Sequence, residues 1–178
     1  MIPTSIDSRK ITNRRLAYSD DLSTFKCDLD DELGCDDFIH KEIEAKLYQK
    51  EKHGVTYIFF YETTMIGYVT LAMSSILAKR IEKRQKGQVP LTSYPSLLVG
   101  RLAVHNEWRD KGVGEYLCNW CVGVALDISE RIGCRYVILQ THKGKRVDYY
   151  AKRGFQKGQE LEDKHEKLVW MYQKITPE

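Results

Sequence analysis

The stretch Leu97–Gly114 constrains the fold of this chain more than any other part of the sequence. The apolar run Leu97–Val104 has the length and content of a buried strand, and Asn106–Asp110 is rich in turn-forming residues. After the turn, apolar residues recur at the spacing of one helix face. They are Val113, Leu117, Trp120, Cys121, Val124 and Ile128. The pattern therefore predicts a strand that leads into a helix through the loop Arg109–Gly114.

The composition of this loop indicates an anion site. The first turn of a helix carries backbone N–H groups without intrahelical partners, together with the positive end of the helix dipole. Gly112 and Gly114 have no Cβ to keep phosphate oxygens away from those N–H groups. Arg109 and Lys111 supply charge for further contacts. We expect a phosphate-bearing cofactor here; the alternative is a tight turn with a glycine entry to the helix.

Composition favours a folded, water-soluble protein. The chain has 178 residues, of which 42% are hydrophobic and 30% charged, so we expect one domain spanning residues 1–178. No apolar run approaches the roughly 20 residues of a membrane helix, and the N-terminus lacks the apolar core of a signal peptide. A cytoplasmic location without membrane contact is expected. The five cysteines, an odd number without framework spacing, fit reduced thiols.

Two metal-like patterns fail on inspection. Cys118 and Cys121 form a C-x-x-C motif, but both fall within the expected helix, and we interpret them as packing residues. Asp28-x-Asp30-x-Glu32 imitates the start of a calcium loop, yet Gly34 comes one place late and Ile39 stands where a bidentate glutamate belongs. No metal site is predicted.

The formal net charge of +3 does not indicate a nucleic-acid-binding protein, but the basic residues are grouped. One group comprises Lys79, Arg80, Lys83, Arg84 and Lys86, and the other Lys143, Lys145, Arg146, Lys152 and Arg153. A solvated surface is the expected role of both groups, and contact with phosphate or RNA is the alternative.

The remaining elements define the fold class. The expected strands are Ile11–Tyr18, Val55–Tyr61, Ile66–Ile76, Leu97–Val104, Tyr136–Thr141 and Leu168–Tyr172. A helix capped by Asp36 or Asp37 should carry Ile39, Ile43 and Leu47 on one face, a basic loop should span Lys79–Ser96, and a short helix should follow from Lys145 to Arg153. This order predicts an α/β protein with a mixed sheet, a hairpin-rich first half and a βαβα second half.

On these residues the chain resembles the GNAT superfamily of acyl-coenzyme A-dependent N-acetyltransferases. Its Arg/Gln-x-x-Gly-x-Gly/Ala motif is matched by Arg109, Gly112 and Gly114 directly after a strand, and its aromatic-Tyr-x-x-x-Gly-Phe motif by Tyr149–Phe155. A P-loop is excluded because the G-x-x-x-x-G-K pattern is missing. A dinucleotide fold is disfavoured because Leu117 stands where its third glycine belongs.

The resemblance implies acetyl-CoA as acyl donor and assigns the donor site. Backbone groups of Leu102, Ala103 and Val104 would pair with the pantetheine arm like an added strand, and a bulge in this central strand with splaying of its neighbour would open the slot. The pyrophosphate would lie on the loop residues Arg109, Asp110, Lys111, Gly112, Val113 and Gly114.

The resemblance also implies direct attack by an amine on the acetyl carbonyl, with a backbone N–H of the central strand stabilising the oxyanion. Tyr150 would protonate the departing thiolate; the alternative is that Tyr150 is a core aromatic residue before a capping glycine. His105 and His142 stand at the ends of two successive strands, where either could act as a base directly or through water. A polar surface role is the expected one, and neither is assigned as catalytic.

Within the superfamily, the chain is similar to the toxin acetyltransferases that acetylate aminoacyl-tRNA. The matching pieces are Phe25-x-Cys27, Asp37-Phe38-Ile39, Ile66-Gly67-Tyr68 and Gly100–Val104, whereas His105 and Tyr149 depart from the usual pattern. The main expectation is an N-acetyltransferase acting on a primary amine of a small molecule, a peptide or aminoacyl-tRNA. The alternatives are toxin-like acetylation of aminoacyl-tRNA and a non-catalytic acyl-CoA sensor. The resemblance implies an acceptor pocket built from variable loops and the first helices, here the acidic segment around Asp28 and the basic loop. A homodimer is a further expectation.

Overall fold

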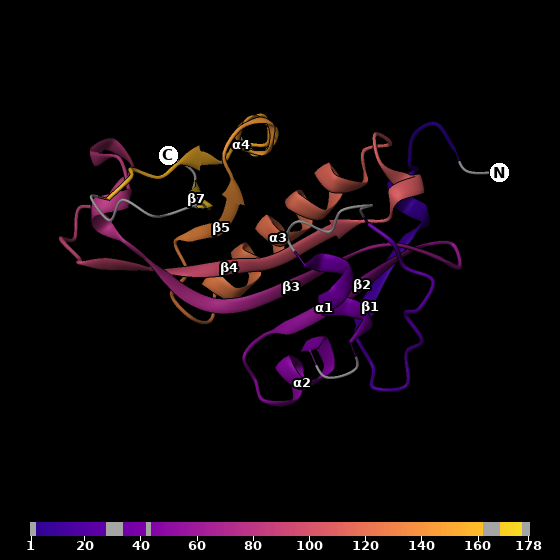
Figure 1. Ribbon diagram of the computed structural model, residues 1–178. Coiled ribbons are helices and arrows are strands. Elements are labelled where there is room, and N and C mark those ends of the chain that lie inside the picture. Colours follow the sequence, from indigo (N-terminus) through magenta and orange to yellow (C-terminus); the bar gives the residue numbers. More distant parts are fainter. Residues whose placement is uncertain (1–2, 28–33, 42–43, 162–167, 176–178) are drawn as a thin grey trace. The chain divides into compact units, whose positions relative to one another are not determined.

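The computed structural model describes residues 3–27, 34–41, 44–161 and 168–175. The described strands are β1 (Ile11–Arg15), β2 (Val55–Tyr61), β3 (Thr64–Leu77), β4 (Ser93–Val104), β5 (Tyr136–His142), β6 (Gln156–Lys157) and β7 (Leu168–Lys174). The described α-helices are α1 (Cys35–His40), α2 (Glu44–Lys50), α3 (Val113–Ser129) and α4 (Lys145–Ala151) (Figure 1).

The strands form a mixed sheet in the order β1-β2-β3-β4-β5-β7-β6. The pairs β1–β2, β2–β3, β5–β7 and β6–β7 are antiparallel, and β4–β5 is parallel. This confirms the predicted fold class, with antiparallel strands first and alternating strands and helices afterwards. β6 was not predicted, because a two-residue strand has no readable period.

The described chain divides into two compact units. The first comprises Met1–Ala72 and Gly100–Cys118, and the second Met73–Val99 and Asn119–Glu178. Strands β3 and β4 and helix α3 contribute residues to both units. The single domain over residues 1–178 stays a prediction, and each unit is described by itself below.

In the first unit, β2 and β3 form the predicted hairpin. Their β-branched and aromatic residues favour strands, and Glu62 adopts a left-handed turn conformation with φ of 55°. The ladder shifts its register between Phe59 and Phe60, an irregularity that the alternating pattern did not predict. β1 pairs with β2 but ends at Arg15, three residues before the predicted end at Tyr18.

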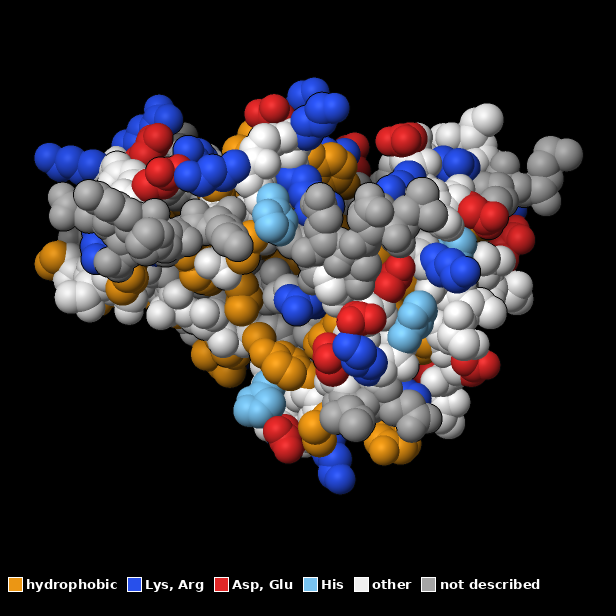
Figure 2. All heavy atoms as spheres, in the orientation of Figure 1, with side chains coloured by type: hydrophobic (Ala, Val, Ile, Leu, Met, Phe, Trp, Pro, Cys, Tyr) orange, Lys and Arg blue, Asp and Glu red, His pale blue; other side chains and the backbone are white. Residues whose placement is uncertain are grey.

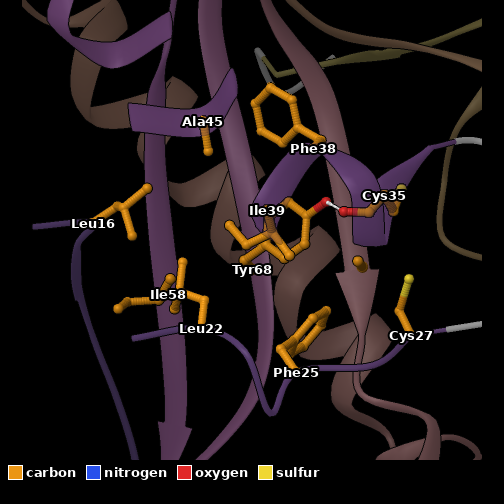
Figure 3. Packing of buried hydrophobic residues seen from close by; sticks show 11 residues of the cluster. Leu16, Leu22, Phe25, Cys27, Cys35, Phe38, Ile39, Ala45, Ile58 and Tyr68 are labelled. Carbon is orange, nitrogen blue, oxygen red and sulfur yellow. Dashed lines mark hydrogen bonds between the residues drawn. The ribbon is translucent and has the colours of Figure 1, made fainter. Parts of the chain in front are cut away.

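The core of the first unit gathers around Tyr68, whose ring is fully buried (Figure 3). The Phe25 ring meets it edge-on at 5.5 Å and the Phe38 ring stacks on it at 6.3 Å. The Tyr68 hydroxyl donates a 2.6 Å hydrogen bond to the backbone carbonyl of Cys35, at the start of α1. Burial raises the pKa of Tyr68 far above its ordinary value, so this hydroxyl stays protonated and anchors α1 to the sheet.

The predicted first helix is wrong in two respects. Its N-cap is Gly34, with φ of 61°, while the Asp36 carboxylate instead accepts a 2.8 Å hydrogen bond from the N–H of Cys27. The helix also breaks into α1 and α2, which leaves Leu47 partly exposed; Ile43 lies outside the described residues. The four acidic residues Asp28, Asp30, Asp31 and Glu32 lie outside them as well.

The core of the second unit is built on tyrosines from successive strands. The Tyr136 ring meets the rings of Tyr94 and Tyr172 edge-on at 5.6 and 5.8 Å.

Two predictions about the second unit are corrected by the structure. The basic loop ends earlier, because β4 begins at Ser93, and Arg80 is buried rather than solvated, with its guanidinium 5.6 Å from the centre of the Trp170 ring.

Candidate active site

The predicted strand, loop and helix are confirmed in the first unit, where β4 runs through the loop Arg109–Gly114 into α3 (Figure 1). Gly112 has φ of 89° and Asp110 has φ of 58°, so the chain turns sharply before the helix. The first helical hydrogen bond runs from the N–H of Tyr116 to the carbonyl of Gly112 at 3.0 Å. The N–H groups of residues 113–115 therefore form the first turn, which has no intrahelical acceptors.

The loop is anchored at its first and third residues, Arg109 and Lys111. The Arg109 guanidinium donates to the backbone carbonyl of Cys27, and the carbonyl of Lys111 accepts a 3.1 Å hydrogen bond from the N–H of Ile6. The sequence did not predict that Arg109 holds another segment of the chain. An added Cβ at Gly112 would meet the Ile6 side chain at 3.6 Å, an ordinary contact. This face of Gly112 therefore packs on protein, and its exposed backbone faces solvent.

The strand residues Leu102, Ala103 and Val104 are half-buried, buried and half-buried respectively. On one side β4 approaches β3 closely: the N–H of His105 donates to the carbonyl of Ile66 at 2.9 Å. The parallel ladder between β4 and β5 covers only Ser96–Leu98 among the described residues. The backbone of residues 102–104 is thus outside that ladder, as the expected pairing with a pantetheine arm requires.

His105 serves as a cap. Its Nδ1 accepts a 3.3 Å hydrogen bond from the N–H of Glu107, and its ring meets that of Phe25 edge-on at 5.6 Å. These contacts give His105 a structural role at the end of β4. His142 ends β5 in the second unit and is half-buried.

Tyr150 lies in the second unit, on the last turn of α4, and is half-buried. Its ring meets those of Tyr149 and Phe155 edge-on at 5.2 and 5.8 Å. Gly154 explains the motif's glycine, because its φ of 87° lets the N–H of Phe155 reach the carbonyl of Tyr150 at 3.2 Å in a Schellman-type cap. The Tyr149–Phe155 motif is thus a fixed aromatic cluster at a helix end.

A cleft of about 360 Å³ opens in the first unit beside Arg101, the residue before the predicted cofactor strand. Its lining comes from α1, α2 and the segment after α2, together with β3 and β4. The lining residues are Phe38, Glu44, Leu47, Tyr48, Glu51, His53, Thr70, Gly100 and Arg101. Figure 2 shows the face that carries α1 and α2, where hydrophobic, acidic and basic side chains lie close together.

The cleft combines an aromatic wall with charged groups. The Arg101 guanidinium lies 5.2 Å from the centre of the Phe38 ring, and its Nε is buried without a hydrogen-bond partner. His53 Nε2 is 3.1 Å from the Glu51 carboxylate, and its ring lies 5.2 Å from that of Tyr48. Sequence reasoning missed these residues, because the lining combines residues 38–53 with Thr70 and with Gly100 and Arg101, and no local motif links these three stretches.

Cys118 and Cys121 are buried on α3, as expected for packing residues. Among the residues that the structure describes, no cluster of three or more His, Cys, Asp or Glu side chains is arranged to hold a metal ion. No helix in the described ranges is both long and apolar enough to cross a membrane.

Comparison with known families identifies the fold and the motifs together. Residues 52–157 match the acetyltransferase (GNAT) domain family, which covers more than half of the chain. The chain belongs to the GNAT acetyltransferase family. Both motifs identified in the sequence fall within the matched GNAT region, from the loop at Arg109 to Phe155.

One sequence relative of this GNAT chain is an acetylating toxin, and solved structures share its fold. A "tRNA-acetylating toxin" of Mycobacterium tuberculosis (strain ATCC 25618 / H37Rv) is 22% identical over 143 residues, which cover 80% of this chain and 82% of the toxin. The structure of AtaT complexed with acetyl-methionyl-tRNAfMet has a TM-score of 0.74 at 20% identity, covering 90% of this chain and 93% of AtaT. A mutant of KacT has a TM-score of 0.74 at 22% identity, covering 90% and 94%.

Proposed function

We propose that this GNAT acetyltransferase transfers an acetyl group from acetyl-CoA to the α-amine of an aminoacyl-tRNA. The observation that carries the proposal is the similarity to a tRNA-acetylating toxin over 80% of the chain. The fold also resembles AtaT, solved with acetyl-methionyl-tRNAfMet and, as a mutant, with acetyl-CoA. The toxin-like alternative from the sequence is thereby preferred to an unspecified primary amine.

The donor would bind on the first unit. The first-turn N–H groups of α3 and the open backbone of Gly112 suit the pyrophosphate, because they offer several donors at the positive end of a 17-residue helix. Residues Leu102, Ala103 and Val104 would pair with the pantetheine arm. The motif's arginine, Arg109, would contribute mainly by fixing the loop, since its guanidinium donates to Cys27.

The acceptor would enter the cleft beside Arg101. Its carboxylates, Glu44 and Glu51, attract an amine, and Phe38 and Tyr48 offer apolar surface to an amino-acid side chain. An α-amine has an ordinary pKa near 7.7 to 8.0, so much of it is already neutral at pH 7 to 8. Such an acceptor needs little help from a base, in contrast to a lysine amine with an ordinary pKa near 10.4.

The reaction would be direct. The neutral amine attacks the acetyl carbonyl, a backbone N–H of β4 donates to the developing oxyanion, and the carbon–sulfur bond then breaks. Tyr150 gives its proton to the departing thiolate, the amine loses a proton to solvent or to a carboxylate, and Tyr150 regains a proton from solvent. The products are an N-acetyl-aminoacyl-tRNA and free coenzyme A.

The test is acetylation of a defined acceptor panel by purified protein. Total charged tRNA, the same tRNA after deacylation, and a lysine-rich peptide are each incubated with labelled acetyl-CoA. We expect label only on charged tRNA, recovered as N-acetyl amino acids after the ester bond is hydrolysed. Transfer to the peptide at an equal rate, or no transfer to charged tRNA, would refute the proposal.

Replacing Tyr150 with Phe separates an enzyme from a non-catalytic acyl-CoA sensor, with Tyr149→Phe as the matched control. Tyr149 neighbours Tyr150, and the Arg153 guanidinium lies 3.5 Å from the centre of the Tyr149 ring. We expect Tyr150→Phe to lower kcat about a hundredfold, the usual contribution of a general acid, with acetyl-CoA affinity unchanged. Full kcat in Tyr150→Phe would remove the assigned role.

A further inference from the structure

Helix α2 presents two different faces to the surface of the first unit. Glu44, Leu47 and Tyr48, spaced three and four residues apart, line the acceptor cleft. Lys46, Gln49 and Lys50 lie on another side of the same helix and line a second hollow. A helix with its side chains is about 10 Å across, so the two sites lie about that far apart.

The second hollow, called the basic hollow here, has a volume of about 220 Å³. Its charged lining consists entirely of cations: Arg15, Lys46, Lys50 and Lys52. Within the described ranges, no carboxylate lies within ion-pair distance of any of these four side chains. Two acids lie nearby: Asp20 is paired with Arg14 at 2.7 Å, and the Asp21 carboxylate accepts a 3.0 Å hydrogen bond from the N–H of Ser23. Lys46 Nζ donates to the backbone carbonyl of Asp20 at 3.0 Å.

The walls of the basic hollow are held in place by hydrogen bonds from the Gln49 side chain to the backbone and by one backbone–backbone bond. Gln49 Nε2 donates to the carbonyl of Leu16 at 2.8 Å, and Gln49 Oε1 accepts from the N–H of Thr56 at 3.1 Å. The N–H of Leu16 in turn donates to the carbonyl of Thr56 at 2.8 Å. One side chain thus ties α2 to the end of β1 and to β2, so the cations are presented from fixed elements.

An exposed aromatic ring stands at the rim. Tyr18 is 77% exposed, and Lys46 Nζ lies 5.5 Å from the centre of its ring. Cations beside an accessible aromatic face are the combination that binds single-stranded RNA, in which phosphates meet the cations and a base stacks on the ring.

We propose that the basic hollow binds the sugar–phosphate backbone of the RNA acceptor near its aminoacylated 3′ end, with a base stacked on Tyr18. The inference rests on the proposed function for the identity of the RNA. It also explains why α2 carries Glu44 on the side of the cleft and Lys46 and Lys50 on another side: one side faces an amine and the other side faces phosphates. An RNA strand passing around α2 reaches both sites.

Binding of fluorescently labelled, deacylated tRNA tests the hollow independently of acetyl transfer. The variant combines Arg15→Gln, Lys50→Gln and Lys52→Gln. Its control combines Arg9→Gln, Lys10→Gln and Lys157→Gln, which removes the same charge from exposed side chains paired with Asp7, Glu62 and Glu160.

We expect the hollow variant to raise the Kd for tRNA about tenfold or more, and to flatten the slope of log Kd against log salt by about 2 to 3, because each lost phosphate contact removes roughly 0.7 to 0.9. The control should leave the slope nearly unchanged. Tyr18→Ala should raise Kd severalfold without changing the slope, because stacking releases no counterions. Equal Kd and slope in the hollow and control variants would overturn the proposal.

Kinetics with charged tRNA distinguish failure of the hollow from failure of the proposed function. In the hollow variant, KM for charged tRNA should rise while kcat and the KM for acetyl-CoA stay constant. If charged tRNA is no substrate but the variant still loses tRNA binding, RNA binding at the basic hollow is supported and the proposed acetylation of aminoacyl-tRNA is refuted. If the variant loses binding of polyglutamate but not of tRNA, the hollow belongs to an acidic protein partner and the RNA proposal is overturned.

Discussion

Gly67 on β3 tests how closely the sheet is packed beside the proposed cofactor strand. A Cβ added at Gly67 would stand 2.7 Å from the carbonyl oxygen of Ala103 and 3.1 Å from a methyl carbon of Leu117. The first contact is with backbone, which cannot rotate away. Next to it, the carbonyl of Ile66 accepts the 2.9 Å hydrogen bond from His105 that joins the two strands. Gly67→Ala must therefore separate β3 from β4 locally.

The magnitude follows from the distances. Ordinary Cβ contacts begin near 3.4 Å, so the carbonyl of Ala103 must retreat by 3.4 − 2.7 = 0.7 Å. Overpacking of this kind typically costs about 1 to 3 kcal/mol of folding free energy. We expect Gly67→Ala to lower the free energy of unfolding by about 2 kcal/mol. Because Ala103 belongs to the strand that would pair with pantetheine, acetyl-CoA affinity should fall as well.

Gly123→Ala is the matched control, since it is the same chemical change with the opposite expected sign. Gly123 lies in the interior of α3, is exposed, and has no atom within 4 Å of an added Cβ. Alanine is favoured over glycine in a helix interior by about 1 kcal/mol. We therefore expect Gly123→Ala to raise the free energy of unfolding by about that amount and to leave acetyl-CoA binding unchanged.

The assay is urea unfolding followed by far-ultraviolet circular dichroism, with acetyl-CoA titrated calorimetrically against each variant. Unchanged slopes with shifted midpoints would show that stability itself changed. If Gly67→Ala unfolds at the same urea concentration as the parent protein, the close approach of β3 and β4 is wrong. If it is destabilised but binds acetyl-CoA normally, Ala103 does not contact the cofactor.

Three further predictions address other parts of the first unit. Gly112→Asp should bind acetyl-CoA about tenfold more weakly than Gly112→Asn, a difference of about 1.4 kcal/mol. The two side chains have nearly the same shape, and only the aspartate charge repels the pyrophosphate. Equal calorimetric affinities of the two variants would refute pyrophosphate binding at this loop. Tyr68→Phe should lower the free energy of unfolding by about 1 to 2 kcal/mol by removing the buried hydrogen bond to Cys35, as measured by urea titration. The hydrogen bond from Arg14 lowers the pKa of Asp20 below its ordinary value of 3.8, so its stabilisation is present above that value and is lost as pH falls through the lowered pKa. Asp20→Asn should therefore weaken the dependence of unfolding free energy on pH below about pH 4, and an unaltered profile would contradict the pairing.

Local patterns predicted most of the elements. The apolar runs identified β2, β5 and β7 within a few residues, because a strand's alternation and a helix's period are properties of neighbouring residues. The glycines of the two motifs were also readable in the sequence. Gly112 and Gly154 both adopt positive φ, as a tight loop and a helix cap require.

Misassigned residues share a different cause. Asp36 is of a residue type that often caps helices, but its carboxylate accepts a hydrogen bond from the backbone N–H of Cys27, nine residues earlier. Arg80 was expected to be a surface cation, yet its guanidinium packs on the ring of Trp170, a residue of β7 that is distant in the sequence. In both cases a tertiary partner replaced the local one, and no window of neighbouring residues contains that partner.

The sequence by itself determined the family, the order of strands and helices, and the loop and aromatic motifs, because these depend on residue spacing along one strand or helix. Only the tertiary structure decided which side chains line the cleft beside Arg101, and that α2 carries Glu44 on the side of this cleft and Lys46 and Lys50 on the side of the basic hollow. Those surfaces combine residues from β1, α1, α2, β3 and β4, and their proximity arises when the sheet and helices pack. The spacing of residues along the sequence does not predict which of these residues come close together.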